Sequence, residues 1–174
     1  MLGKLLGGRN KVLQILSASG FGETYIAEDT RRPGNPQCVV KELKPVSNHP
    51  FNLQVARHLF NTEADILEQL GNHDQIPRLL AYFEEEAHFY LVQELIVGHP
   101  LSQEISNGKA WMESQIVEML QDVLWVLSFV HRNQLVHRDV KPDNLIRRDQ
   151  DGKLVLIDFG AVKQLQTQML SDKS

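Results

Sequence analysis

The stretch VHRDVKPDNL (136–145) is the feature that most constrains how this chain can fold. It crowds charged and polar residues between a long apolar segment (113–132) and two short apolar runs (144–148 and 153–160) joined by an Asp-Gly turn. The first segment reads as a helix and the two runs read as strands. A polar surface loop is one interpretation. The other is a site that handles phosphate, a metal ion and a hydroxyl proton within one turn of chain.

A second motif, LIDFG, strengthens the second interpretation. Asp158 ends an apolar strand and is followed by Phe-Gly, where glycine lets the backbone turn. A carboxylate in this position suits a divalent cation, and Asn144 offers a neutral oxygen to the same kind of hard cation. Asp139 could take a proton from an incoming hydroxyl, and Lys141 could neutralise charge on a moving phosphoryl group. His-Arg-Asp alone fits a polar loop, whereas both motifs at this spacing favour a site.

Lys41 interrupts a third apolar run, QCVVKEL (37–43). By strand alternation it could simply face solvent. Alternatively, it is a fixed cation that contacts phosphates. Such a lysine requires a carboxylate that orients it. Glu63 lies on the following predicted helix, on the same face as Leu59 and Leu67. A helical glutamate is usually solvated, so the pair carries more weight than either residue alone.

The order of the predicted elements indicates an α+β chain in two parts. A β-rich part covers 10–96, and a helical part covers 97–174 after the break at VGHP. In the second part, the segment 113–132 is apolar nearly all round, which predicts a buried helix. The remaining predicted elements are strands at 11–17, 24–30, 37–43, 78–85 and 88–95, and a helix at 51–70 that stops at Gly71-Asn72.

Composition excludes several classes of protein. The chain has 174 residues, of which 42% are hydrophobic and 23% charged, with a net charge of -4. This balance is typical of a folded domain and disfavours a general binder of nucleic acid or anionic membrane. Cys38 is the single cysteine, so neither an internal disulfide nor a cysteine zinc cluster can form. No segment is typical of a signal peptide or a membrane span, and we expect a cytoplasmic location.

These motifs together resemble the eukaryotic-type protein kinases. The shared order is a Gly-rich turn, a strand lysine, a helix glutamate, HRDVKPDN and DFG. The Lys-Pro pair in the loop resembles the serine/threonine branch. SGFGETYIAEDT, CVVKELKP and LVLIDFGAVK are similar to bacterial, especially cyanobacterial, members. The resemblance runs from about Asn10 to the end. It implies a two-lobed fold with a complete N-lobe, an antiparallel sheet plus one helix, and only the first part of a helical C-lobe.

The resemblance implies a role for each motif residue. Lys41, held by Glu63, would contact the α and β phosphates of ATP. Asp139 would be the catalytic base that orients the substrate hydroxyl, and Lys141 would steady the γ-phosphate. The Mg²⁺ ligands would be Asn144 and Asp158. The implied reaction is ATP-dependent phosphoryl transfer to serine or threonine hydroxyls of proteins.

The resemblance also implies an ATP pocket between the lobes. Gln93 falls at the gatekeeper position, with Glu94 and Ile96 in the hinge that meets adenine through backbone groups. The whole implied set is Ser17, Ser19, Gly20, Phe21, Gly22, Thr24, Val39, Lys41, Gln93, Glu94, Ile96 and Ile146. An apolar column would join the lobes, formed by Leu67, Leu79, His137 and Phe159.

The phosphate loop departs from the family pattern G-x-G-x-x-G-x-V. Ser17 and Ser19 stand at the first two glycines, Gly22 at the third and Thr24 at the valine. Serine adds a side chain where the backbone should approach phosphates closely, and Gly20, displaced by one position, compensates only in part. We therefore predict that nucleotide binding is weakened but not abolished.

The chain also ends 14 residues after Gly160, whereas the family continues through an activation segment and further helices. Arg138 resembles the arginine that pairs with a phosphorylated activation loop, for which Thr167 and Ser171 are the hydroxyl candidates. An exposed apolar face on helix 113–132 would favour association. Two alternatives to an active protein kinase stay open: a truncated, catalytically incompetent remnant that binds nucleotide or a partner kinase, and a small-molecule kinase of similar fold.

Overall fold

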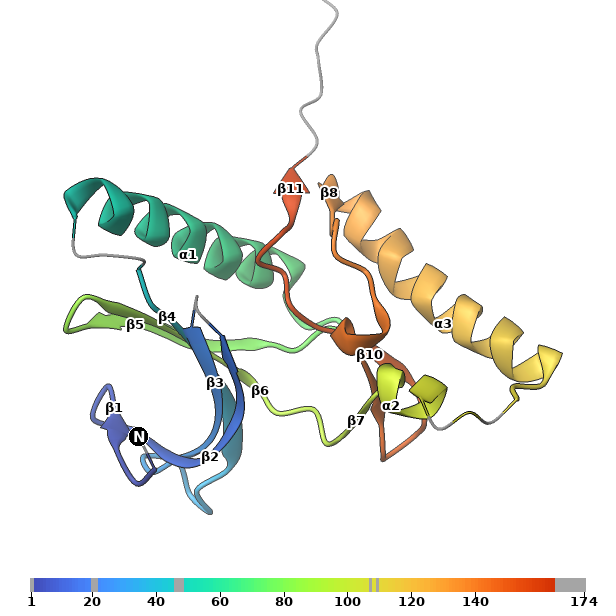
Figure 1. Cartoon of the computed structure of the whole chain (residues 1–174), viewed down its shortest axis with the longest axis horizontal. Coiled ribbons are helices and arrows are strands. Elements are labelled where there is room, and N and C mark those ends of the chain that lie inside the picture. Colours follow the sequence, from blue (N-terminus) through green and yellow to red (C-terminus); the bar gives the residue numbers. More distant parts are fainter. Residues whose placement is uncertain (1, 20–21, 46–48, 107, 109, 165–174) are drawn as a thin grey trace, which may run out of the picture.

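The first half of the chain forms a curled antiparallel sheet of six strands in the order β1-β2-β3-β4-β6-β5 (Figure 1). The computed structural model describes residues 2–19, 22–45, 49–106, 108 and 110–164. The strands are β1 (Leu5–Leu6), β2 (Asn10–Ser19), β3 (Gly22–Asp29), β4 (Gln37–Leu43), β5 (Leu79–Glu85) and β6 (His88–Glu94). Sequence analysis did not predict β1, which begins before residue 10. Its Leu6 is buried, so this short strand belongs to the sheet core.

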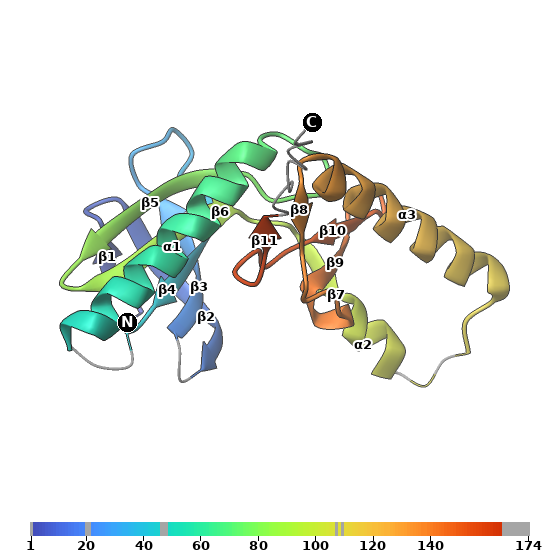
Figure 2. The ribbon, with the colours of Figure 1, turned by 90° about the horizontal axis from the view of Figure 1, so that it is seen from above.

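Helix α1 (Pro50–Leu70) lies along one face of this sheet, as Figures 1 and 2 show. Proline at the first helical position needs no backbone partner, and Nδ1 of His49 accepts a hydrogen bond from Phe51 N at 3.3 Å. Gly71 ends the helix with a φ of 61°, a conformation that glycine adopts without strain. The predicted helix and its stop are thus confirmed.

Strand alternation divides β4 between two environments. Cys38 and Val40 pack into a small core with Tyr25 and Tyr90. The residues of β4 that alternate with these, such as Leu43, face α1 and the larger core instead. Lys41 shares the face of Leu43, so it points away from the small core and toward the second half of the chain.

The second half consists of short strands and two helices around the larger core. Its elements are β7 (Gly98–Pro100), α2 (Leu101–Ser106), α3 (Glu113–Arg132), β8 (Leu135–Val136), the 3₁₀ turn η1 (Pro142–Asn144), β9 (Leu145–Arg148), β10 (Leu154–Leu156) and β11 (Lys163–Gln164). Three of the strands form the sheet β10-β9-β7, and β11 pairs with β8. The predicted strand at 153–160 is shorter in the structure, because the chain leaves the sheet after Leu156 to form the Asp-Phe-Gly turn. The short elements β7, α2, β8 and β11 were not predicted.

Helix α3 has the predicted bounds but not the predicted burial. Only Val126 and Val130 of this helix are fully buried. Its inner side packs on β8 and β10, while Leu124 and Trp125 are 64% and 65% exposed. The prediction of a helix buried all round is therefore wrong for the described part of the chain. The exposed apolar face is confirmed, and it also includes Ile116, Val117 and Leu120.

Gln75, in the loop between α1 and β5, ties the two halves together. It is buried, and its Nε2 donates to Leu154 O at 2.8 Å and to Asp122 O at 3.3 Å. Its own carbonyl accepts the N–H of Leu156 at 2.9 Å. A single loop residue thereby satisfies backbone groups of both α3 and β10. No sequence signal pointed to it, because glutamine in a polar loop is ordinarily solvated.

We expect Gln75→Ala to lower the free energy of unfolding by about 2–4 kcal/mol, since it leaves a cavity and deprives the buried Leu154 carbonyl of the donor from Gln75. Denaturant unfolding would measure the change. Gln69→Ala is the matched control, because its Nε2 makes an exposed hydrogen bond to Asn133 O at 3.1 Å. The control should lose less than about 1 kcal/mol. Equal losses in the two variants would contradict the bridging role of Gln75.

No helix among the described residues is long and apolar enough to cross a membrane.

Candidate active site

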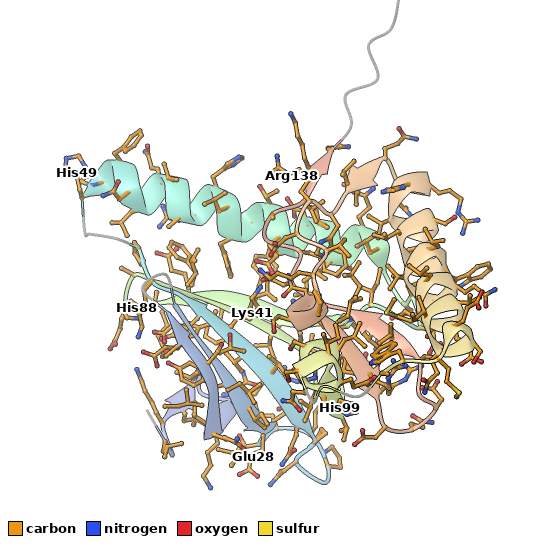
Figure 3. The ribbon with its side chains drawn as sticks, turned by 45° about the vertical axis from the view of Figure 1, so that its right-hand side comes forward. Glu28, Lys41, His49, His88, His99 and Arg138 are labelled. Carbon is orange, nitrogen blue, oxygen red and sulfur yellow. The ribbon has the colours of Figure 1, made fainter. Side chains whose placement is uncertain are left out.

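Lys41 stands at the centre of the first group of polar residues, between the sheet and α1 (Figure 3). Its Nζ lies 2.5 Å from Glu63 Oε1 and 2.9 Å from Asp158 Oδ1. The lysine comes from β4, the glutamate from α1 and the aspartate from the turn after β10. Three segments far apart in sequence therefore meet at one ammonium group. The glutamate that the sequence offered as a partner for Lys41 is in contact with it.

The charges of this group support one another. Burial disfavours the charged form of Lys41, but the carboxylates of Glu63 and Asp158 outweigh it and raise the pKa of the lysine above its ordinary value. Burial likewise favours the neutral acid at Asp158. The ammonium of Lys41 outweighs that effect and lowers the pKa of Asp158. Both groups are thus charged at neutral pH, as a phosphate contact and a cation ligand must be.

A second group forms in the loop that follows β8. Lys141 Nζ lies 2.8 Å from Asp139 Oδ2, and Asn144 Nδ2 donates to the same oxygen at 2.9 Å and to Asp139 O at 2.9 Å. The hydrogen bond from Lys141 is the main cause that lowers the pKa of Asp139, and Asn144 contributes. Asp139 is exposed enough to meet a substrate, whereas Asn144 is buried.

The backbone joins the two groups. Ile157, just before Asp158, donates its N–H to Asn144 O at 2.9 Å. Asp158 itself has a φ of 64°, which is uncommon for a residue with a side chain. Such a conformation persists only where the surroundings hold it, and here the bond to Lys41 and the packing of Phe159 do so. The turn thereby directs the Asp158 carboxylate toward Lys41.

His137 packs against this turn and hydrogen-bonds to its backbone. Its ring lies edge-on to Phe159 with centroids 4.9 Å apart. Burial lowers the pKa of His137, so the ring is neutral. Its Nε2 lies 3.2 Å from Ile157 O, and the N–H of Asp139 approaches Nδ1 at 3.4 Å. These partners require the tautomer with the proton on Nε2. Leu67 and Phe159 share the larger core, with Leu79 packed against it, so the predicted apolar column is contiguous with this core.

Arg138 makes a different contact from the one implied by the resemblance. It too has a positive φ, of 67°. Its Nε donates to Ala161 O at 2.7 Å, next to the pairing of β8 with β11. The side chain therefore holds the backbone just after the Asp-Phe-Gly turn. Thr167 and Ser171 lie outside the described residues.

A cleft of about 370 Å³ opens beside Lys41, Glu63 and Asp158. Ser17 and Thr24, which oppose each other in the β2–β3 ladder, belong to its lining. The other lining residues are Gly22, Glu23, Glu42, Leu43, Leu59, Phe60, Leu91 and Gly160. Sequence analysis missed the apolar members of this lining; strand alternation could have found Leu91, which is directly opposite Lys41 on β6.

Gly22 has a packing role at the edge of this cleft. A Cβ on Gly22 would overlap the carbonyl oxygen of Glu42 on the adjacent strand, so a larger residue would separate β3 from β4. Gly20 and Phe21, two other residues of the predicted phosphate loop, lie outside the described residues. Ser19 is the last residue of β2 and is opposite Gly22.

The adenine-side residues expected from the sequence do not line this cleft. Val39 and Gln93 lie on the same sheet face as Lys41 and Leu91, two residues further along their strands, and Gln93 is buried. Glu94 ends β6 and Ile96 follows it in the connection to β7, while Ile146 lies on β9. The structure thus brings Lys41, Glu63 and Asp158 together and places Val39 and Gln93 near them on the sheet, whereas Ile96 and Ile146 lie outside the six-stranded sheet.

Sequence comparisons with known proteins identify one family. The protein kinase domain family matches residues 12–173. The chain is 46% identical over 169 residues to serine/threonine-protein kinase B of Synechocystis sp., covering 97% of this chain and 29% of that protein. It is also 46% identical over 162 residues to serine/threonine-protein kinase PknA of Nostoc sp., covering 92% of this chain and 29% of that protein.

The chain therefore spans about 29% of the length of these relatives. The matched family, the curled sheet with one helix and the two hydrogen-bonded groups around Lys41 and Asp139 all agree. The chain belongs to the protein kinase family, and it carries the curled antiparallel sheet with one helix and part of the helical lobe of a protein kinase fold.

Proposed function

We propose that this chain takes part in ATP-dependent phosphoryl transfer to serine or threonine hydroxyls of proteins. The observation that carries the proposal is the pair of linked groups, Lys41–Glu63–Asp158 and Asp139–Lys141–Asn144, joined through the Ile157–Asn144 hydrogen bond. We assign 10–96 to the ATP-binding lobe and 97–174 to part of the second lobe. The names of the relatives support the serine/threonine class.

Each charged side chain has a separate role in the proposed transfer. Lys41, held by Glu63, supplies a fixed positive charge for phosphate oxygens, and the cleft that opens beside it gives them access. Asp139 is ionised and exposed, so it can accept the proton of a substrate hydroxyl. Lys141 adjoins it and can balance charge on the phosphoryl oxygens. The transition state spreads charge over those oxygens, so this positioning of charge is the main contribution expected of the protein.

The residues present fit a Mg²⁺ ion held together with phosphate. Asn144 uses its amide nitrogen on Asp139, so its oxygen is the atom left for a cation, and Asp158 offers an ionised carboxylate. Among the described residues, no three His, Cys, Asp or Glu side chains gather into an all-protein metal site. Mg²⁺ commonly takes one or two protein oxygens and completes its shell with phosphate and water. When bound, the ion neutralises phosphate charge.

Phosphotransfer itself tests the proposal. The chain would be incubated with Mg²⁺ and γ-labelled ATP, with mixed serine- and threonine-containing acceptor proteins. We expect acid-stable label on serine or threonine of the acceptors or of the chain itself. ATP binding without any label would instead support the second candidate function, a non-catalytic module. The exposed apolar face of α3 is the specific observation that favours that candidate.

Lys141→Met should shift the acidic limb of the kcat/KM profile to higher pH. Ionised Asp139 is the active base, so activity falls as pH drops through its pKa. Lys141 is the main cause that lowers this pKa, and without it the pKa returns toward the ordinary aspartate range. Lys153→Met is the control, because Lys153 pairs with Asp74 on the far turn. An unmoved acidic limb in Lys141→Met would show that Lys141 does not set the ionisation of Asp139.

A further inference from the structure

A cluster of charged side chains lies on the sheet face opposite to that of Lys41, because side chains alternate along β3 and β4. Glu23 of β3 and Glu42 of β4 are directly opposite each other, and like charges in such a pair repel. Tyr25 Oη lies 2.7 Å from Glu23 Oε2 and 2.5 Å from Glu42 Oε2. One hydroxyl proton can serve only one carboxylate at a time. Lys44 Nζ lies 2.5 Å from Glu23 Oε1 and 3.7 Å from Glu42 Oε2, and its charge therefore offsets the repulsion.

The two carboxylates differ in how firmly they are held. The Glu42 side chain is fully buried, and its Oε1 accepts from Tyr90 Oη at 3.2 Å and lies 2.6 Å from His88 Nδ1. Glu23 is partly exposed, and its ion pair is with Lys44. The hydrogen bond in this pair lowers the pKa of Glu23 and raises the pKa of Lys44, so both groups are charged at neutral pH. The position of Glu23 therefore depends on Lys44 more than the position of Glu42 does.

Each carboxylate stands between two residues that line the cleft. These four neighbours are Gly22 and Thr24 around Glu23, and Lys41 and Leu43 around Glu42. The backbones of β3 and β4 approach so closely here that a Cβ on Gly22 would overlap the carbonyl oxygen of Glu42. The bonds of Lys44 on one face of the sheet therefore also fix the separation of the cleft residues on the other face.

A second ion pair joins the other end of β3 to β2. Lys11 Nζ lies 3.4 Å from Glu28 Oε1. The side chains of Glu23 and Glu28 are equally exposed, at 23%. Neither Lys11 nor Glu28 is among the residues that line the cleft, and Glu28 lies well away from Lys41 in Figure 3. The strand thus carries a pair of the same kind at each end, and of the two, the Lys44–Glu23 pair is the one beside the cleft.

We propose that the Lys44–Glu23 pair holds β3 against β4 at the spacing that nucleotide phosphates require, so that both are positioning residues for the site around Lys41. The inference rests on the proposed function, because it requires phosphates beside Lys41. Neither side chain has to contact the nucleotide. Without the ion pair, the carboxylates of Glu23 and Glu42 repel each other and the Gly22 end of β3 moves away from β4. The cleft then holds phosphates less precisely around Lys41.

Glu23→Gln distinguishes this positioning role from an effect of charge alone. Removing a negative charge from the wall of the cleft should, on charge alone, tighten the binding of ATP. We expect the opposite: the Kd for Mg²⁺-ATP, measured by titration calorimetry, should rise about fivefold, the equivalent of one partly exposed ion pair. Lys44→Met should raise the Kd by a similar factor. Lys44→Arg, which keeps the charge, should bind Mg²⁺-ATP nearly as tightly as the parent.

Glu28→Gln is the matched control, because it loses the same charge and breaks the pair with Lys11 at the other end of β3. Its Kd should stay within about twofold of the parent value. Tighter or unchanged binding in Glu23→Gln would overturn the inference, even if the melting temperature of that variant fell, since a merely structural pair would give that result. Equal weakening in Glu28→Gln would overturn it too. If the parent binds no ATP at all, the proposed function fails and this inference fails with it; if the parent binds ATP and Glu23→Gln matches it, this inference alone fails.

Discussion

Asp139→Asn should lower phosphoryl transfer by about 10²–10⁴-fold, the usual contribution of a positioned general base. Asparagine keeps the size of the side chain but cannot accept the hydroxyl proton. Asp139 contacts Lys141 and Asn144 rather than Lys41, so ATP binding beside Lys41 should change little. The transfer of labelled phosphate and the Kd for ATP, measured side by side, would separate the two effects.

Asp143→Asn is the matched control for this loss. Asp143 lies in the same loop, four residues further on, and is exposed. The Asp143→Asn variant loses the same charge but keeps the proposed base Asp139. Its rate of phosphoryl transfer should therefore stay within a few-fold of that of the parent. An equal loss in both variants would mean that the net charge of the loop, rather than proton acceptance by Asp139, governs the rate.

Asp158→Asn should remove the stabilisation of the chain by Mg²⁺-ATP. A ligand that binds only the folded state stabilises it by about 2.7 kcal/mol at a hundredfold excess over its Kd. In the parent, we expect Mg²⁺-ATP to raise the melting temperature; in the variant, the rise should be largely lost because the cation has lost its carboxylate. Asparagine is chosen because it tolerates the positive φ of Asp158 better than alanine does.

Asp65→Asn, an exposed position on α1 two residues after Glu63, is the control and should respond to Mg²⁺-ATP like the parent. Melts with ATP and EDTA would show how much of the effect needs the metal. If Asp158→Asn were stabilised as strongly as the parent, Asp158 could not be the main protein ligand of the cation. A parent chain that melts cooperatively but gains nothing from Mg²⁺-ATP would count against the nucleotide site as a whole.

Periodicity predicted the regular elements well where they are long. The bounds of α3 agree with the sequence, and those of α1 differ by one residue, because apolar positions recur over several turns in both. Four strands of two or three residues, β1, β7, β8 and β11, escaped prediction since their pairing partners define them. Burial of α3 was also misjudged: periodicity reports which faces are apolar, whereas burial depends on which other segments cover them.

The sequence by itself determined which residues the proposed chemistry would use. Residue types at motif spacing, above all HRDVKPDN and DFG, predict a lysine, a base and two oxygen ligands. Such motifs are local, so their spacing survives in the sequence. The tertiary structure decided which residues meet across space: Lys41 with Asp158, and Gln75 with both halves of the chain. Those contacts join residues as many as 117 positions apart, and only the folding of the sheet onto the second half brings them together.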